Sequence, residues 1–385
     1  MSFILANTSF LSEQKGCVML TMARYRRQLI LTLLICTAAV LAGCSTLNTE
    51  GTGEITNTTP ASVPAETSSV GTEAIPEQSD TDSQETSSTD TEIIMQNIEL
   101  STVPEGYYEP ANEPGTLETF TYNTKNYIED GRTIQSRATV YLPYGYDQND
   151  DSTRYDILYL QHGAYGDEQT WMYEYGDSFK NMIDHMIEDK LIAPLIIVMP
   201  YLPSGNEWYH DTTPIFYSEE IKNDLMPAAE AYYHTYAGGI TDEDFVASRS
   251  HRAFGGFSAG GTTTWRAFLE GLDRFEYFMP MSGGLTLGGD GSTDTEDAQR
   301  LADAAVSSGY GKTEYYIFAA TGTRDVAYQG LSAQIEAMKS LTEAFDYTES
   351  GFADGNLMYY TVSGNRHDYQ YTYEYVYNAL RAFAH

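Results

Sequence analysis

One serine in the chain has the neighbours that a catalytic nucleophile needs. The pentapeptide Gly256-Phe257-Ser258-Ala259-Gly260 connects an apolar run, Ala253–Phe257, to a segment of helical periodicity, Thr262–Leu272. In a sharp strand-to-helix turn the serine hydroxyl is exposed, and glycines let the flanking chain approach closely. The N-terminus of the helix also directs free N–H groups at a developing negative charge. The pattern predicts nucleophilic catalysis by Ser258, and the alternative is a glycine-rich turn with a capping serine.

A serine hydroxyl needs a histidine to take its proton and an acid to orient that histidine. With such a turn the usual chain order is serine, acid, histidine. Only His367 and the terminal His385 follow Ser258, and His367 stands in a loop after a predicted strand. Asp325 follows the preceding predicted strand, whereas Asp368 is adjacent to His367, and neighbouring side chains rarely face each other. We therefore predict Ser258, Asp325 and His367 as a catalytic triad.

Two backbone N–H groups should stabilise the oxyanion, those of Ala259 and Ala164. Ala164 lies in the loop His162–Gly166 after a predicted strand, and we expect His162 to fix this loop by hydrogen bonding. Aromatic residues near the predicted rim are expected to bind substrate, namely Tyr165, Trp171, Tyr201 and Trp208. The spacing of His, Asp and Glu does not suggest a metal site, and we expect no metal or cofactor.

The elements that position these residues alternate along the chain. Apolar, β-branched or aromatic runs predict strands at Ala138–Leu142, Asp156–Gln161, Leu195–Pro200, Ala253–Phe257, Tyr277–Met281, Tyr315–Ala320 and Met358–Val362. Helical periodicity falls at Phe179–Ile187, Glu219–Tyr233, Thr262–Leu272, Ala298–Ala305 and Ser332–Phe345. The C-terminal segment from Tyr369 to Phe383 fits either a strand or a helix, and we predict a helix because a strand has just ended. Continuous apolar strands separated by helices predict a mostly parallel central sheet with helices on both faces, an α/β fold.

Acidic residues outnumber basic ones, 55 Asp and Glu against 21 Lys and Arg, which gives a formal net charge of −34 at pH 7. Such a charge repels phosphates and argues against a nucleic-acid partner. All three cysteines, Cys17, Cys36 and Cys44, lie near the N-terminus. The rest of the chain therefore has no cysteine nucleophile, disulfide framework or thiolate metal site.

The N-terminal segment has the features of a secretory signal. Arg24, Arg26 and Arg27 precede an apolar run that ends in Leu41-Ala42-Gly43-Cys44. The run has about 14 residues, fewer than the ~20 that span a bilayer, so a transmembrane helix is the less favoured alternative. The cysteine after Leu-Ala-Gly resembles the lipidation site of bacterial lipoproteins. We expect a lipid anchor at Cys44 and a location outside the cytoplasm, on the bacterial cell envelope.

These features divide the chain into three parts. Residues 1–43 are the expected signal peptide, with Met22 as the expected true start. Residues 44–100 are the lipidated cysteine and an acidic, Ser- and Thr-rich tether, too polar to fold on its own. Residues 101–385 are the expected enzyme domain.

Several separated segments resemble feruloyl esterase modules of carbohydrate esterase family one, a group of esterase-D-like α/β hydrolases. The segments are Tyr159–Gly166 (YLQHGAYG), His251–Gly261 (HRAFGGFSAGG), Tyr277–Gly283 (YFMPMSG) and Tyr315–Tyr328 (YYIFAATGTRDVAY). The resemblance covers roughly residues 115–385. It implies an α/β-hydrolase fold with Ser258, Asp325 and His367 as the triad, and hydrolysis of feruloyl esters on plant cell-wall polysaccharide such as xylan. The alternatives are an acetyl xylan esterase, an acyltransferase, or a carbohydrate-binding lipoprotein with an inactive site.

Overall fold

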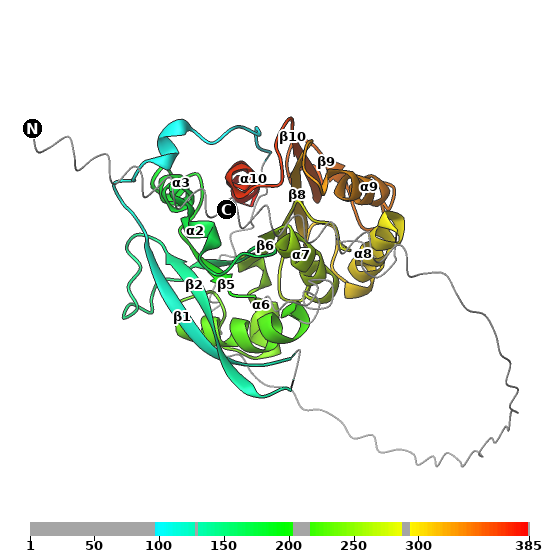
Figure 1. Cartoon of the computed structure of the whole chain (residues 1–385). Helices are drawn as coiled ribbons and strands as arrows, with labels where there is room; N and C mark the ends of the chain where they lie inside the picture. The colour runs from blue at the N-terminus through cyan, green and yellow to red at the C-terminus, as the bar shows by residue number, and fades with distance from the viewer. Residues whose placement is uncertain (1–96, 128–129, 203–215, 287–292, 384–385) are drawn as a thin grey trace, which may run out of the picture. The chain divides into compact units, whose positions relative to one another are not determined.

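A nine-stranded sheet forms the centre of the domain that the structure describes (Figure 1). The computed structural model describes residues 97–127, 130–202, 216–286 and 293–383. The strand order is β1-β2-β5-β3-β6-β7-β8-β10-β9, with β1, β2 and β5 paired antiparallel and every other pair parallel. The strands are β1 Thr116–Lys125, β2 Thr133–Leu142, β3 Asp156–Gln161, β5 Leu195–Pro200, β6 Arg252–Phe257, β7 Tyr277–Met281, β8 Tyr316–Gly322, β9 Tyr347–Thr348 and β10 Leu357–Val362.

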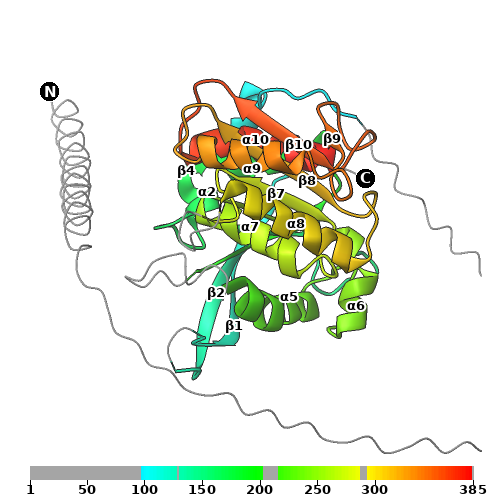
Figure 2. The same ribbon diagram turned by 90° about the vertical axis from the view of Figure 1, so that its right-hand side faces the viewer.

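Helices cover both faces of this sheet, as Figures 1 and 2 show. One face carries α7 (Ala259–Glu270), α8 (Asp294–Ser308), α9 (Tyr328–Met338), the π-helix η2 (Phe216–Leu225), α5 (Met226–Tyr232) and α6 (Asp242–Ala247). The other face carries α2 (Thr170–Tyr173), α3 (Ser178–Glu188) and α10 (Tyr369–Ala382). The short elements η1 (Glu105–Tyr108), β4 (Glu174–Asp177) and η3 (Arg249–His251) complete the described secondary structure.

The central strands are apolar on both sides because each face has its own core. Along β3, Ile157 and Tyr159 belong to the core under α7, while Leu158 and Leu160 belong to the core under α3 and α10. All four side chains are at most 2% exposed. Side chains of a strand alternate between the two faces, so a doubly covered sheet needs the continuous apolar runs that the sequence shows.

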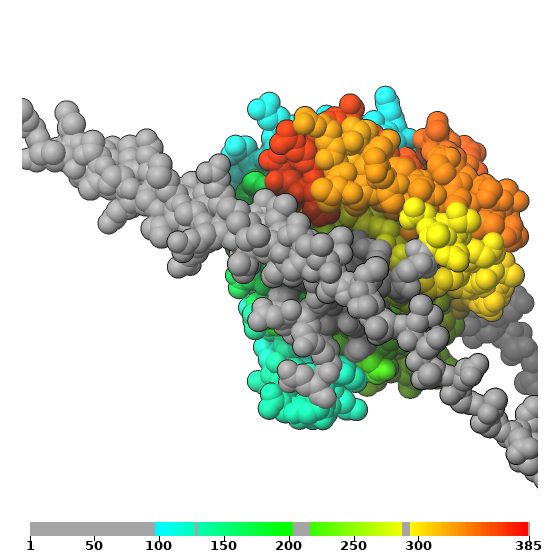
Figure 3. Space-filling model, turned by 45° about the vertical axis from the view of Figure 1, so that its right-hand side comes forward, coloured from blue at the N-terminus to red at the C-terminus, as the bar shows by residue number. Residues whose placement is uncertain are grey.

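The prediction of a mostly parallel sheet between two helical layers is confirmed, with differences at its edges. β1, β4, β9, α2 and α6 were not predicted, and α9 begins and ends earlier than the expected helix Ser332–Phe345. The predicted helix Glu219–Tyr233 is a π-helix, η2, followed by α5. Figure 3 shows the teal surface of β1 and β2 at the opposite end of the domain from the orange surface around α9 and β9, as the strand order requires. The predicted segments 1–43 and most of 44–100 lie outside the described residues.

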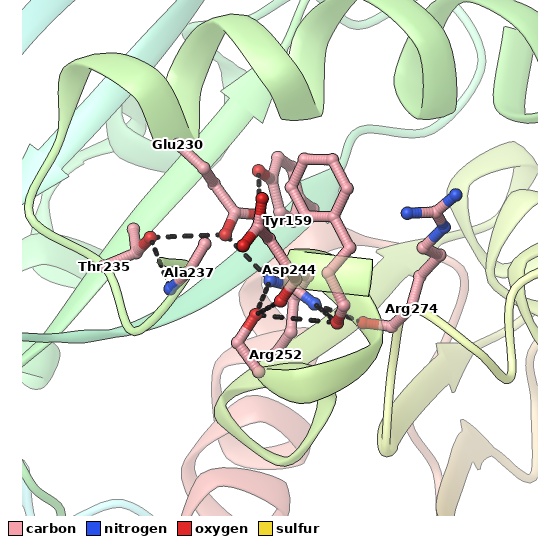
Figure 4. Close-up of polar contacts among 9 residues, drawn as sticks. Tyr159, Glu230, Thr235, Ala237, Asp244, Arg252 and Arg274 are labelled. Atoms are coloured by element: carbon pink, nitrogen blue, oxygen red, sulfur yellow. Dashed lines mark hydrogen bonds and ion pairs between the residues drawn. The ribbon is translucent and has the colours of Figure 1, made fainter. Parts of the chain in front are cut away.

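A buried network of charges lies at the start of β6 (Figure 4). Arg252 forms two hydrogen bonds to the Glu230 carboxylate, at 2.7 and 2.8 Å, and both side chains are at most 1% exposed. The same carboxylate accepts hydrogen bonds from the hydroxyls of Tyr159 and Thr235, at 3.0 and 3.2 Å. The other acceptors for Arg252 are the carbonyls of Phe245 and Arg274 and the hydroxyl of Ser248. All five guanidinium donors are thus satisfied, as a buried charge requires.

Within the described residues, no helix is both long and apolar enough to cross a lipid bilayer.

Candidate active site

Three loops at one edge of the sheet hold the predicted triad. Ser258 follows β6, Asp325 follows β8 and His367 follows β10, and these strands run parallel with only β7 between β6 and β8. The carboxyl ends of parallel strands meet at the same edge, which is where α/β proteins place their ligand sites. The buried Arg252 network lies at the other end of β6, so the scaffold and the site are separated by the length of this strand.

The turn at Ser258 has the geometry of a nucleophile elbow. Ser258 has φ 58° and ψ −113°, a conformation that non-glycine residues seldom adopt and that stores strain. It precedes the first residue of α7, and its own N–H donates to the carbonyl of Met281 at 2.9 Å. Only glycine fits at position 260, because a Cβ there would lie 2.3 Å from the carbonyl oxygen of Gln161. The elbow therefore packs closely against the C-terminal end of β3.

A continuous chain of hydrogen bonds joins the three predicted catalytic side chains. His367 Nε2 lies 2.8 Å from Ser258 Oγ, and His367 Nδ1 lies 2.8 Å from Asp325 Oδ1. The Asp325 side chain is fully buried, while that of His367 is 28% exposed. The second nitrogen of a histidine that faces a buried carboxylate is the one that can accept a proton from serine. The arrangement can therefore generate a serine nucleophile.

The alternative acid, Asp368, has a different role. Its side chain accepts the N–H of Gln370 at 3.0 Å and caps α10, and it also accepts the hydroxyl of Tyr175. Asp325 is instead held in place by the N–H of Ala327, which donates to its Oδ1 at 2.8 Å. The loops after β8 and β10 bring together the acid and base that the chain order predicted.

The predicted oxyanion loop lies directly beside Ser258. A Cβ built on Gly163 would be 3.2 Å from Ser258 Cβ, and Ala164 is the next residue. Ala259 is the first residue of α7, so its N–H has no acceptor within the helix and lies at the positive end of the helix dipole. Of the two predicted donors, Ala259 thus begins the helix that follows Ser258, and Ala164 belongs to the neighbouring loop after β3.

His162 is not part of the proton chain, as expected. Its Nε2 accepts the N–H of Leu202 at 3.1 Å, and its Nδ1 lies 2.7 Å from the carbonyl oxygen of Gly163. Burial lowers the pKa of the His162 imidazole, because the charged form would lose its hydration. The residue is 1% exposed and holds the loop that contains Ala164.

Sequence reasoning missed Tyr369, whose hydroxyl reaches the oxyanion loop. The N–H of Gly163 donates to this hydroxyl at 2.6 Å. The ring packs against Phe257, with centroids 4.7 Å apart, and Phe257 in turn packs against the His367 ring at 4.5 Å. The position of Tyr369, two residues after His367, was the only signal in the sequence.

The four predicted substrate-binding aromatics differ in their placement. Tyr165 is 84% exposed in the loop beside Ser258. Tyr201 follows β5 at the same edge of the sheet, and the Arg137 guanidinium lies 4.5 Å from its ring centroid. Trp171 was expected at the rim, but it is fully buried and packs against Phe179 and Tyr369, because α2 turns it into the core. Trp208 lies outside the described residues.

Among the residues whose placement the structure gives, no group of three or more His, Cys, Asp or Glu side chains is arranged to hold a metal ion.

Comparison with known proteins agrees with this geometry. The family model described as "Putative esterase" matches residues 133–373. Endo-1,4-beta-xylanase Y of Acetivibrio thermocellus is 38% identical over 288 residues, which cover 75% of this chain and 25% of that protein. An endo-1,4-beta-xylanase/feruloyl esterase of Xylanibacter ruminicola is 28% identical over 209 residues, which cover 53% of this chain and 24% of that protein. The chain thus matches about a quarter of the length of each of these two relatives.

A solved structure is similar over most of the described domain. It is a serine-to-alanine mutant of the feruloyl esterase module from Clostridium thermocellum in complex with sinapinate. The two chains are 36% identical with a TM-score of 0.64, and the match covers 76% of this chain and 96% of the module. The protein therefore belongs to the esterase family, and its fold is that of the α/β hydrolases.

Proposed function

We propose that the protein is a serine esterase that hydrolyses feruloyl esters on plant cell-wall polysaccharide such as xylan. The observation that carries the proposal is the hydrogen-bonded chain Ser258–His367–Asp325, with 2.8 Å at each step, at the end of a strained elbow. The relatives support the substrate class. The two curated relatives are xylanases, one of which is also named a feruloyl esterase, and the similar solved structure is a feruloyl esterase module. A complete triad argues against a carbohydrate-binding protein with an inactive site.

The first half of the reaction forms an acyl-enzyme. His367 Nε2 takes the proton from Ser258 Oγ as that oxygen attacks the ester carbonyl. Asp325 stabilises the imidazolium that results and keeps the ring oriented with Nε2 towards the serine. The same proton then goes to the ester oxygen of the sugar as its bond to the acyl carbon breaks, so the polysaccharide leaves as an alcohol and the acyl group stays on Ser258.

The second half releases the acid. Water attacks the acyl carbonyl while His367 takes its proton, and the bond from the acyl carbon to Ser258 Oγ then breaks as His367 returns the proton to Oγ. In both halves the carbonyl oxygen becomes negative, and the N–H groups of Ala164 and Ala259 stabilise it. Preorganised donors of this kind are worth about 10²–10³-fold in rate each.

Aromatic side chains near the loop beside Ser258 would bind the hydroxycinnamoyl ring. Tyr165 is exposed there, Tyr201 follows the neighbouring strand, and Trp208 belongs to the same proposed group. Stacking contributes about 0.5–1.5 kcal/mol beyond area burial, and an acetyl group gains almost none of it.

The test compares methyl ferulate with methyl acetate, two esters that share a leaving group. We expect kcat/KM for methyl ferulate to be higher by at least about tenfold, equal to ~1.4 kcal/mol of transition-state binding. Equal values, or faster release of acetate from acetylated xylan, would contradict the feruloyl assignment. The serine esterase mechanism would still stand in that case.

We also propose that Cys44 carries a lipid anchor, that residues 44–100 tether the enzyme domain to the bacterial cell envelope, and that residues 1–43 are the signal peptide that precedes it. The support is the sequence alone, a short apolar run that ends in Leu-Ala-Gly-Cys. In cells that express Cys44→Ala, the protein should accumulate as unprocessed precursor. The membrane fraction of these cells should contain no mature lipoprotein. Normal processing of this variant, followed by immunoblot, would refute the anchor.

A further inference from the structure

Both polar backbone atoms of Gly163 are held by side chains, one from the preceding residue and one from a distant part of the chain. Its N–H donates to the hydroxyl of Tyr369 at 2.6 Å, and its carbonyl oxygen lies 2.7 Å from His162 Nδ1. The contact with Tyr369 spans 206 positions of sequence. Neither side chain takes part in the proton transfers described above. Their contacts beside Ser258 must therefore serve a different role.

The hydrogen bonds of His162 determine which ring nitrogen carries its proton. The N–H of Leu202 donates to Nε2 at 3.1 Å, and it can do so only if Nε2 is unprotonated. The proton of the neutral ring is therefore on Nδ1, which donates to the Gly163 carbonyl. Burial also disfavours the charged ring, since it lowers the pKa of His162. His162 is thus a fixed donor to one specific carbonyl.

Fixing that carbonyl also fixes the direction of the next N–H. The peptide unit is planar and trans, so the carbonyl of Gly163 and the N–H of Ala164 point in opposite directions. With the carbonyl directed at His162, the N–H of Ala164 is directed away from it. If the peptide flipped, a carbonyl oxygen would replace this N–H and would repel an oxyanion. Glycine lacks a side chain to oppose such a flip, so the restraint must come from its surroundings. Besides the His162 ring, the N–H of Gly166 donates to the Gly163 carbonyl at 3.2 Å.

Tyr369 adds a second restraint and connects this loop to the catalytic base. Its ring lies between Trp171, at 5.2 Å, and Phe257, at 4.7 Å, and it begins the helix that follows His367. Because its hydroxyl accepts the Gly163 N–H, that N–H is engaged, and within this loop the N–H left for the oxyanion is that of Ala164. The loop after β3 and the helix after β10 are therefore held in a fixed relation.

From this geometry we infer that Tyr369 and His162 are positioning residues, which hold Gly163 so that the Ala164 N–H is preorganised for the oxyanion. The inference rests on the proposed esterase function and adds two residues to its machinery. Preorganisation stabilises the transition state without affecting how the uncharged substrate binds.

The main test is Tyr369→Phe, which removes one hydroxyl and keeps the ring packed between its neighbours. We expect kcat for methyl ferulate to fall about 10- to 100-fold, somewhat less than for loss of an oxyanion donor, while KM changes less than about twofold. The matched control is Tyr373→Phe in the same helix. The Tyr373 hydroxyl is buried without a hydrogen-bond partner among the described residues, so this variant should keep wild-type kcat.

A second readout separates positioning from general damage to the fold. An arylboronic acid forms a tetrahedral adduct on the serine and places an oxygen in the oxyanion hole, whereas ferulate binds as a product. In Tyr369→Phe the inhibition constant of the boronic acid should rise by about the same factor as kcat falls, and the dissociation constant of ferulate should stay within twofold. Equal weakening of both ligands would mean a distorted pocket and would contradict the inference.

Variants of His162 provide an independent check. The side-chain amide of Asn can donate from nearly the position of Nδ1, so His162→Asn should keep more activity than His162→Leu, by about tenfold. Should His162→Leu fail to fold, the Tyr369→Phe result decides the question alone.

The two possible failures can be told apart. A folded wild type with no esterase activity would overturn the proposed function, and this inference with it. An active wild type with Tyr369→Phe within twofold of its kcat would overturn the inference alone.

Discussion

Replacing Glu230 by alanine should destabilise the fold strongly and leave the chemistry intact. Glu230 and Arg252 are buried together, and the Arg252 guanidinium makes five hydrogen bonds, two of them to Glu230 (Figure 4). The variant leaves a buried positive charge without its counter-ion, which costs about 3–5 kcal/mol. Arg252 begins β6 and Ser258 follows its other end, so kcat of the folded variant should stay within about twofold of wild type.

The assay is urea unfolding of wild type, Glu230→Ala, Arg252→Met and the double variant. An apolar pair in place of a buried ion pair is often tolerated, so the double variant should be less destabilised than the sum of the two single variants by at least about 2 kcal/mol. A loss below about 1 kcal/mol for Glu230→Ala, or strict additivity, would refute this reasoning. A kcat of the folded Glu230→Ala variant that differs from that of wild type by more than about twofold would show that the Arg252 network does affect the active site.

Two further predictions concern buried carboxylates. Asp325→Asn should keep the fold but lower kcat by about 10⁴-fold, because the amide favours the wrong His367 tautomer; steady-state rates with methyl ferulate would check this, and a loss below tenfold would contradict it. Burial raises the pKa of Glu220 from its ordinary value of 4.5 to about 7, so the folded state binds a proton more tightly than the unfolded state. The stability that this proton provides is present below pH 4.5 and is lost as pH rises through about 7. As pH rises from 5 to 8, the free energy of unfolding of wild type should therefore fall by about 2–3 kcal/mol relative to that of Glu220→Gln, measured by urea unfolding. Parallel pH profiles of the two proteins would contradict this prediction.

The inner strands were predictable because burial on both faces leaves a strong signal. β3, β5, β6 and β7 are short apolar runs, and each lies where the sequence indicates. β1 was missed because it is an edge strand with polar residues on its open side, which resembles a loop in sequence. The helix expected at Ser332–Phe345 lies too far along the chain, because α9 already ends at Met338. Ala344 and Phe345 are buried after α9 and give an apolar pattern without a helix.

The proximity of Ser258, Asp325 and His367 was predictable because chain order and loop position leave few choices. Ser258, Asp325 and His367 each follow a recognisable strand, and the fold brings them within hydrogen-bonding distance. Contacts between distant loops carry no such signal. The sequence does not reveal that Tyr369 bonds to Gly163, or that a four-residue helix turns Trp171 inward.

The most direct test of the central claim is the rate of ferulate release from methyl ferulate by wild type and by Ser258→Ala. The substitution removes one oxygen from a residue at the surface of the elbow, so the unfolding midpoint should hardly change. The nucleophile cannot be replaced by its neighbours, and kcat/KM should fall by at least about 10⁴-fold. A folded Ser258→Ala variant that keeps a tenth of wild-type activity would contradict the account.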